Sequence, residues 1–247
     1  MSEEIYLSVI IPGRNEEKRI AKTLDAVAEH LSKQSYTAEV IFVDGGSTDN
    51  TIDVVQSKKD KFTKLHVIEE GKSISQHGGK GIAVKLGMIA AIGKYKCFID
   101  SDNGAPFEQI DKLFEQIDKY DVVIGSRYIN GDNQTERSLL RTIISRGGSL
   151  FFKILIGENL KDTRCPLKLF RGDVAQKLFH FQKLKGFGFD TEIFAIARKY
   201  KYTVKEVPVE FHDVAGSKVT MKDTLKSFWE GFQIRWYLWN GSYKDKK

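Results

Sequence analysis

The sequence predicts an α/β protein built on one mostly parallel β-sheet with helices on both faces. Up to residue 126, short apolar runs alternate with stretches whose apolar residues recur at helical spacing. The apolar runs are nearly continuous, which is typical of strands covered on both faces. The chain has 247 residues, of which 41% are hydrophobic. That length allows one large or two small domains and a substantial core.

The predicted elements follow each other in a regular order. The strands, which are short and apolar, are expected at 6–11, 38–43, 64–69, 96–100 and 121–126. The intervening helices are indicated by apolar residues spaced three or four apart and by a cap at 47–49; they are expected at 20–31, 51–59, 82–93 and 107–119. Beyond residue 130 the alternation stops. A basic, apolar segment occupies 137–157, and a further strand is expected at 203–211.

The C-terminal segment 221–247 is rich in aromatic residues, including Trp229, Trp236 and Trp239, at mixed helical spacing. It predicts an amphipathic helix appended to one continuous domain that covers 1–220. Two interpretations of the aromatic residues stay open. They pack against the core, or they lie at a membrane interface, where Trp and Tyr favour the level of the lipid headgroups.

Composition narrows the class of partner. The net charge is +6, from 39 Lys and Arg against 33 Asp and Glu, which suits anionic partners without choosing among them. Basic residues are interspersed with acidic ones and no aromatic-basic platform stands out, so a nucleic-acid partner is not expected. Cys97 and Cys165 predict two reduced, buried thiols. We see neither a signal peptide nor an apolar run of transmembrane length, so any membrane contact is expected to be peripheral.

Polar residues follow the predicted strands at the points where they end. In open parallel sheets, ligands bind beyond the carboxyl ends of the strands. The polar clusters in these positions are Asn15-Glu16, Asp44, Gly79-Lys80, Asp100 with Asp102, and Ser126-Arg127. Together they predict one site that holds both acidic and basic groups.

Asp100 and Asp102 are two residues apart at the end of a strand, so they share a face and repel each other unless something intervenes. A divalent cation, a neighbouring Lys or Arg, or water would relieve that repulsion. With basic clusters close by, the favoured hypothesis is Mg²⁺ or Mn²⁺ bound with a nucleoside diphosphate. The chain lacks the GxxxxGK[ST] loop, and HGGKGIAVKLG does not match GxGxxG.

Several motifs resemble those of family 2 glycosyltransferases of GT-A fold, over roughly residues 5–220. They are VIIPGRNEEKRI, VDGGSTDNT, GGKGIAVKLGM, DSD, GSR, DTRCPLKLF and FGFDTEIF, in that order. The branch they resemble most is that of the dolichyl- or polyprenyl-phosphate hexose synthases. The resemblance implies a Rossmann-like sheet and a metal-dependent, inverting transfer of a hexose from a nucleotide-sugar to a polyprenyl phosphate, for glycan assembly such as protein glycosylation. The GKG-x-A-V motif favours UDP-glucose over GDP-mannose.

The resemblance also implies roles for individual residues. The nucleotide-sugar would contact Pro12, Asn15, Glu16, Asp44, Lys80, Asp100 and Ser101, and the metal would bind Asp100 and Asp102. The catalytic and acceptor side would comprise Asp102, Arg127, Arg141, Ser145, Lys168, Asp190 and Glu192, with Ser217 and Lys218 as weaker acceptor-loop candidates. Two departures stand out. Gly104 replaces a frequent Gln that serves as a further metal ligand, and 212–215 lacks the usual Arg before Gly-x-Ser-Lys.

Chemistry favours a phosphate acceptor. A phosphate monoester, with a second pKa of about 6, is already largely dianionic at neutral pH, so it needs cations rather than a base. A hydroxyl acceptor on a polysaccharide or glycan, the main alternative, would need a carboxylate base such as Asp190 or Glu192. A second alternative is a non-catalytic module that binds nucleotide-sugars or a membrane surface. The favoured hypothesis places the protein peripherally on the cytoplasmic side of a membrane.

Overall fold

The computed structural model describes residues 4–70, 79–129, 157, 160–212 and 221–244, with the side chains of 221–228 left out. The strands are β1 (Leu7–Gly13), β2 (Ala38–Asp44), β3 (Leu65–Glu69), β4 (Tyr95–Phe98), β5 (Val122–Ser126), β6 (Lys168–Arg171) and β7 (Val204–Pro208). The α-helices are α1 (Ile20–Ser32), α2 (Thr51–Gln56), α3 (Lys80–Ala90), α4 (Ile110–Ile117), α6 (Gly172–Phe181), α7 (Phe189–Lys199) and α8 (Met221–Trp239). Short 3₁₀ helices occupy Lys59–Lys61 and Phe107–Gln109.

The seven strands form one sheet in the order β3-β2-β1-β4-β6-β5-β7. All neighbouring strands are parallel except β6, which runs antiparallel to both β4 and β5. The prediction of one mostly parallel sheet is therefore confirmed. The sequence analysis did not predict β6, α6 or α7. Strand β6 gives a weak signal, because it is only four residues long and begins with a lysine. That lysine, Lys168, is buried, against the usual preference of its residue type.

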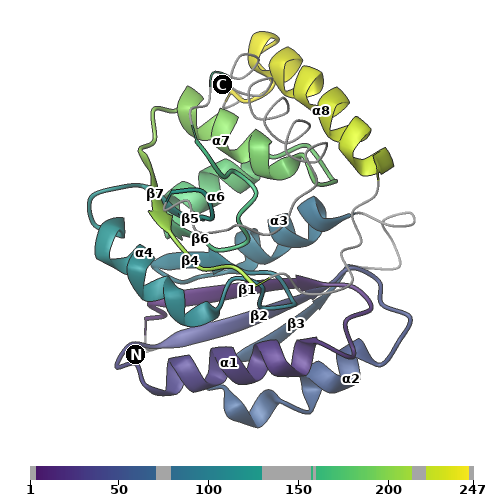
Figure 1. Cartoon of the computed structure of the whole chain (residues 1–247), viewed down its shortest axis with the longest axis vertical. Helices are drawn as coiled ribbons and strands as arrows, with labels where there is room; N and C mark the ends of the chain where they lie inside the picture. The colour runs from purple at the N-terminus through teal and green to yellow at the C-terminus, as the bar shows by residue number, and fades with distance from the viewer. Residues whose placement is uncertain (1–3, 71–78, 130–156, 158–159, 213–220, 245–247) are drawn as a thin grey trace.

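Two hydrophobic clusters cover the two faces of the sheet. One lies between the sheet and α3, α6, α7 and α8, and includes Phe98, Phe170 and Phe194. The other lies against α1 and α4, and includes Leu24, Phe42 and Leu113. Figure 1 shows the result: α1 and α2 lie on one side of the sheet, and α7 and α8 lie on the opposite side of the molecule.

The state of the two cysteines agrees with the prediction from the sequence. Cys97 and Cys165 are both free and buried, on strand β4 and just before β6 respectively. Burial raises the pKa of the Cys165 thiol to about 12 and raises that of Cys97 as well. Both therefore remain protonated and unreactive in the folded protein.

Several element boundaries differ from the prediction. The helix expected at 107–119 opens with a 3₁₀ turn, and its α-helical part ends at Ile117. The strand expected at 203–211 is only β7, Val204–Pro208. The helix after the 47–49 cap starts at Thr51, whose backbone N–H donates to Asp49 Oδ1 at 3.1 Å. Nearly all of the 137–157 segment lies outside the described residues.

The aromatic residues of the C-terminal helix divide between buried and exposed positions. Tyr237 packs, partly buried, against the core cluster, and the nearby Tyr243 is fully buried. Trp229, Trp236 and Trp239 are exposed instead. Among the described residues, no helix is both long enough and apolar enough to cross a membrane.

Candidate active site

Lys80 and Asp100 form the centre of the site. Lys80 is the first residue of α3, and Asp100 follows the end of β4. The Lys80 Nζ atom lies 2.6 Å from Asp100 Oδ1, and both side chains are mostly buried. Desolvation by itself would lower the pKa of Lys80, but the charges of Asp100, Asp190 and Asp102 outweigh it and raise that pKa. Lys80 is therefore a fixed cation next to three carboxylates.

Asp102 lies in the turn beyond β4, close to Asp100. Burial and the charge of Asp100 raise the pKa of Asp102, against the opposing effects of Arg19, Lys80 and a hydrogen bond from Gly104. That hydrogen bond, from Gly104 N–H to Asp102 Oδ1, is 3.1 Å long. The electrostatic repulsion expected from the Asp-x-Asp spacing is thus present, and Lys80 compensates part of it.

Gly104 is confined by an aromatic side chain. A Cβ atom at position 104 would lie 2.9 Å from Phe211 Cε2, closer than real contacts allow. A backbone hydrogen bond also joins residue 104 to the segment that carries Phe211, because His212 N–H donates to the Gly104 carbonyl at 2.8 Å. A side chain at position 104 would therefore require the Phe211 ring to shift.

Lys168 and Asp190 form a second charged pair, which is buried. The Lys168 Nζ atom donates to Asp190 Oδ1 at 2.7 Å and to the Cys165 carbonyl at 2.6 Å. It also lies 4.7 Å from the centre of the Phe98 ring. Asp190 is close enough to Lys80 to affect its pKa, so this pair adjoins the Lys80–Asp100 pair.

Glu192 does not join Asp190. The two residues are on α7, but Glu192 is fully buried on another side and accepts hydrogen bonds from Lys183 N–H, Leu184 N–H and the Tyr243 hydroxyl at 2.9, 2.8 and 2.7 Å. Burial raises the pKa of Glu192 despite these bonds. The expected acidic pair at 190 and 192 is therefore two separate carboxylates, because positions two apart on a helix face different directions.

Arg127 is held by Asp162, a residue that sequence reasoning did not single out. Its Nε and Nη2 atoms donate to the two oxygens of Asp162 at 2.7 and 2.8 Å. The guanidinium also lies 5.0 Å from the ring of Phe211, the residue that confines Gly104. The signal for Asp162 was available, because it opens the DTRCPLKLF motif.

The loops that follow β1 and β2 are joined by polar side chains. Asn15 Oδ1 accepts from Thr48 N–H at 2.8 Å, and Asp44 Oδ2 accepts from the N–H groups of Gly46 and Ser47, both at 2.9 Å. Glu16 binds the Arg19 guanidinium through both carboxylate oxygens. Pro12 pairs within the sheet next to Val43 of β2. The buried Ser101 receives a hydrogen bond at its carbonyl from Thr23.

The structure thus brings Lys80, Asp100, Asp102, Lys168 and Asp190 together, and places the Asn15 and Asp44 loops at the carboxyl ends of β1 and β2. The remaining predicted residues Arg141, Ser145, Ser217 and Lys218 lie outside the described residues.

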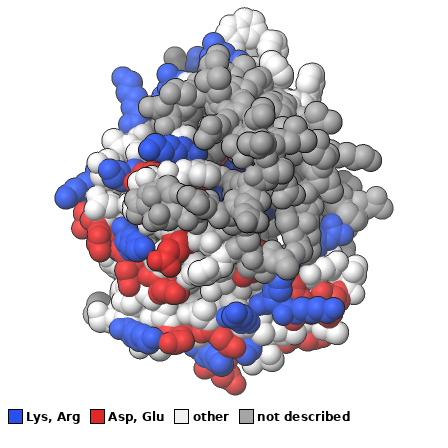
Figure 2. All heavy atoms as spheres, in the orientation of Figure 1, with Lys and Arg blue, Asp and Glu red and all other residues white. Residues whose placement is uncertain are grey.

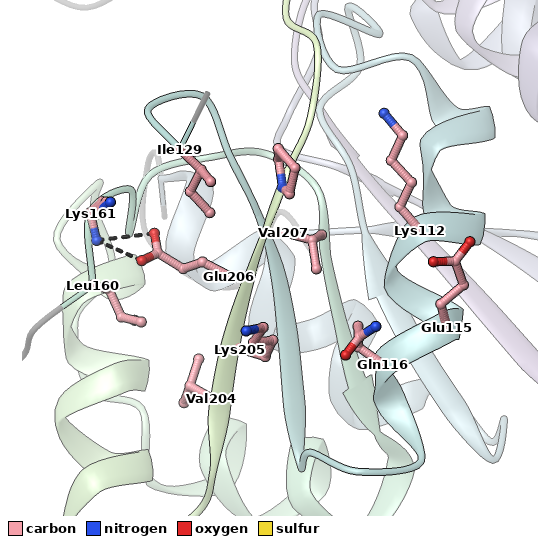
Figure 3. A pocket seen from close by; sticks show the side chains of 11 residues that line it. Lys112, Glu115, Gln116, Ile129, Leu160, Lys161, Val204, Lys205, Glu206 and Val207 are labelled. Atoms are coloured by element: carbon pink, nitrogen blue, oxygen red, sulfur yellow. Dashed lines mark hydrogen bonds between the residues drawn. The ribbon is translucent and has the colours of Figure 1, made fainter. Parts of the chain in front are cut away.

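A cavity of about 710 Å³ lies elsewhere, between α4 and the edge strand β7 (Figure 3). Lys161 N–H donates to both oxygens of Glu206 at its border. None of the predicted site residues lines it.

The sheet and its flanking helices form a GT-A fold, which two similar solved structures share. Mannosyl-3-phosphoglycerate synthase from Rubrobacter xylanophilus is similar in structure, with a TM-score of 0.72 and 14% identity over 98% of this chain and 77% of that one. A second similar structure is glucosyl-3-phosphoglycerate synthase from Mycobacterium tuberculosis in complex with Mn²⁺, UDP-glucose and phosphoglyceric acid. Its TM-score is 0.67, with 18% identity over 94% of this chain and 78% of that one.

The chain belongs to glycosyl transferase family 2, whose model matches residues 8–179. It is 33% identical to the dolichyl-phosphate beta-glucosyltransferase of Saccharomyces cerevisiae, over 99% of this chain and 78% of the relative. The enzyme of the same name from Drosophila melanogaster is also 33% identical, over 94% and 73%. The resemblance predicted from the motifs is confirmed, and the chain is a glycosyltransferase, which rules against the non-catalytic alternative.

Proposed function

We propose that this protein transfers glucose from UDP-glucose to a polyprenyl phosphate such as dolichyl phosphate, with inversion at the anomeric carbon. The relatives named as dolichyl-phosphate beta-glucosyltransferases support both the sugar and the lipid. An α-linked donor attacked in line gives a β-linked product, which agrees with those names. The product would supply glucose for glycan assembly at the cytoplasmic side of a membrane.

The pairing of Asp190 with Lys168 is the observation that favours a phosphate acceptor over a hydroxyl. A hydroxyl nucleophile would need a carboxylate that is available to take a proton. Asp190 accepts a hydrogen bond from the buried Lys168, and Glu192 already accepts three hydrogen bonds. Both arrangements suit a structural or positioning role, whereas a dianionic phosphate needs only cations to attract it.

The residues at the Asp-x-Asp turn fit a divalent cation. Mg²⁺ and Mn²⁺ prefer oxygen ligands, and Mg²⁺ is usually held by one or two carboxylates while water and phosphate oxygens complete its coordination. Asp100 and Asp102 supply two carboxylates that repel each other, and Gly104 offers no side chain as a further ligand. When bound there, the cation would neutralise the negative charge that develops on the departing nucleoside diphosphate.

The other residues of the site would bind and orient the substrates. Asn15, in the loop after β1, and Asp44, at the end of β2, would hold the nucleoside, since ligands bind at the carboxyl ends of parallel strands. Lys80 would contribute positive charge to the diphosphate. Asp162 fixes the Arg127 guanidinium, which would attract the lipid phosphate together with Arg141 and Ser145.

A transfer assay tests the proposal. Purified protein is incubated with Mg²⁺ or Mn²⁺, radiolabelled UDP- or GDP-hexoses and a short polyprenyl phosphate, and label is counted after extraction into organic solvent. We expect lipid label from UDP-glucose, lost on addition of EDTA and in Asp102→Ala. The matched control is Asp173→Ala, which removes an exposed carboxylate on α6. Donor binding without lipid label from any sugar would overturn the proposal and favour hydroxyl acceptors.

A further inference from the structure

Helix α8 carries a row of exposed aromatic side chains, here called the aromatic stripe: Trp229, Phe232, Trp236 and Trp239. Their exposed fractions are 66%, 52%, 55% and 76%. They are spaced three or four residues apart, so they share one face of the helix. The rings of Trp236 and Trp239 are in contact, with centroids 5.0 Å apart. Single exposed apolar residues are normal, but a contiguous row of this size marks an interaction surface.

The opposite face of α8 holds the helix on the protein. Ile234 is fully buried in the core cluster, and Tyr237 and Leu238 pack against it. At Gly188, which precedes α7, a Cβ atom would lie 2.4 Å from the Glu230 side chain, so the two helices meet closely. Because that face is buried, the aromatic stripe is turned outward. Figure 1 places α8 at the top of the molecule, farthest from α1 and α2.

The chemistry of the stripe fits a lipid bilayer surface. Tryptophan has a large apolar ring and one N–H donor, and it is favoured at the level of the headgroups. The segment 221–247 contains six basic residues against three acidic ones, a balance that is attracted by anionic lipid. Arg235 and Lys244 are among the exposed ones. In Figure 2, white side chains project at the top of the molecule with blue ones beside them.

We propose that the aromatic stripe is a membrane-docking surface, with α8 lying flat on the bilayer and its tryptophans at the headgroup level. The proposal deepens the proposed function, on which it rests for the presence of the acceptor in the membrane. Since α8 packs on Gly188, two residues before Asp190, docking would hold the charged site at a fixed distance from the lipid surface.

Tryptophan fluorescence tests this directly, because all three tryptophans of the chain belong to the stripe. The protein is mixed with vesicles of phosphatidylcholine, with and without phosphatidylserine, in the absence of nucleotide-sugar and polyprenyl phosphate. We expect a blue shift of the emission, quenching by brominated phosphatidylcholine, and tighter binding when phosphatidylserine is present. An unchanged emission spectrum with every vesicle would overturn the proposal. Since the mixture contains no substrate, the outcome does not depend on the transfer reaction.

Vesicle flotation of variants adds a second test. The double variant Trp236→Ser/Trp239→Ser should bind vesicles at least about tenfold more weakly, because two large apolar side chains no longer enter the interface. The matched control is Ile92→Ser, an exposed residue (70%) in the turn before β4. Equal vesicle binding by the two variants would overturn the proposal that the aromatic stripe docks on the membrane. Light scattering without vesicles completes the test: a dimer that the double variant abolishes would show that the stripe pairs two copies, and would overturn the proposal.

Discussion

The Lys80 Nζ atom lies 2.6 Å from Asp100 Oδ1, so a cation supplied by the chain itself already sits beside the Asp-x-Asp turn. A neighbouring lysine and a divalent cation, two of the means of relieving the repulsion between Asp100 and Asp102, are thus compatible. Lys80 compensates it within the protein, while burial and the charge of Asp100 still raise the pKa of Asp102. The negative charge that Lys80 leaves uncompensated favours a divalent ion. The stability of this turn and its proposed role in metal binding are therefore opposed.

Asp102→Asn should make the protein more stable at neutral pH. Burial and the charge of Asp100 raise the pKa of Asp102 in the folded state, so the ionised group destabilises the fold above that pKa. The destabilisation disappears as the pH falls below the ordinary carboxyl pKa, where Asp102 is protonated in both states. We expect a rise of the melting temperature by no more than a few degrees at pH 7 and a smaller difference at pH 4. Asp173→Asn is the control, and a less stable variant at pH 7 would contradict the prediction.

Gly79→Ala should be more destabilising than Gly46→Ala, although both glycines have a positive φ, of +83° and +81°. Gly46 has open space around its Cβ position, so Ala there should cost only the conformational term, about 1–2 kcal/mol. At Gly79 the new Cβ would also lie 2.8 Å from the Lys185 carbonyl oxygen. We expect a further loss of about 1–3 kcal/mol. Urea unfolding measures the loss of stability in both variants. Equal losses would show that the backbone at Lys185 moves aside without an energetic cost.

Lys168→Met should destabilise the protein by about 3–5 kcal/mol, because it leaves the buried Asp190 carboxylate without its partner. Asp190→Asn in the same chain should recover part of that loss. The measurement is a double-mutant cycle by chemical denaturation, with a coupling energy above about 1 kcal/mol expected. If the stability loss of the double variant equals the sum of the losses of the two single variants, the ion pair does not act as a unit in the folded protein.

Tyr243→Phe should loosen the C-terminal segment. Its hydroxyl donates to Glu192 Oε1 at 2.7 Å, and the loss of a hydrogen bond to a buried carboxylate costs about 1–3 kcal/mol. Hydrogen exchange should become faster in residues 229–244 relative to the wild type. Tyr128→Phe, at an exposed tyrosine, is the matched control. Unchanged exchange in the Tyr243 variant would mean that apolar packing alone holds this segment.

The elements of the first half of the chain were predictable because their signals are local. Five strands and the helices between them follow from apolar periodicity, which reports which side of each element faces the core. The edge where the site lies was predictable too, because carboxyl ends of parallel strands share one edge. Asp100, Asp102 and Lys80 meet there as expected.

The partners of the buried charges were decided only by the tertiary structure. Lys168 meets Asp190 across 22 positions, Arg127 meets Asp162 across 35, and Glu192 meets Tyr243 across 51. The reversed strand β6 brings Lys168 into the core, where a pattern of apolar residues predicts no lysine. Sequence periodicity indicates whether a residue is buried, whereas the partner of a buried charge depends on which distant elements pack around it. For that reason the sequence by itself determined the class of chemistry, and the fold decided which carboxylates already have partners.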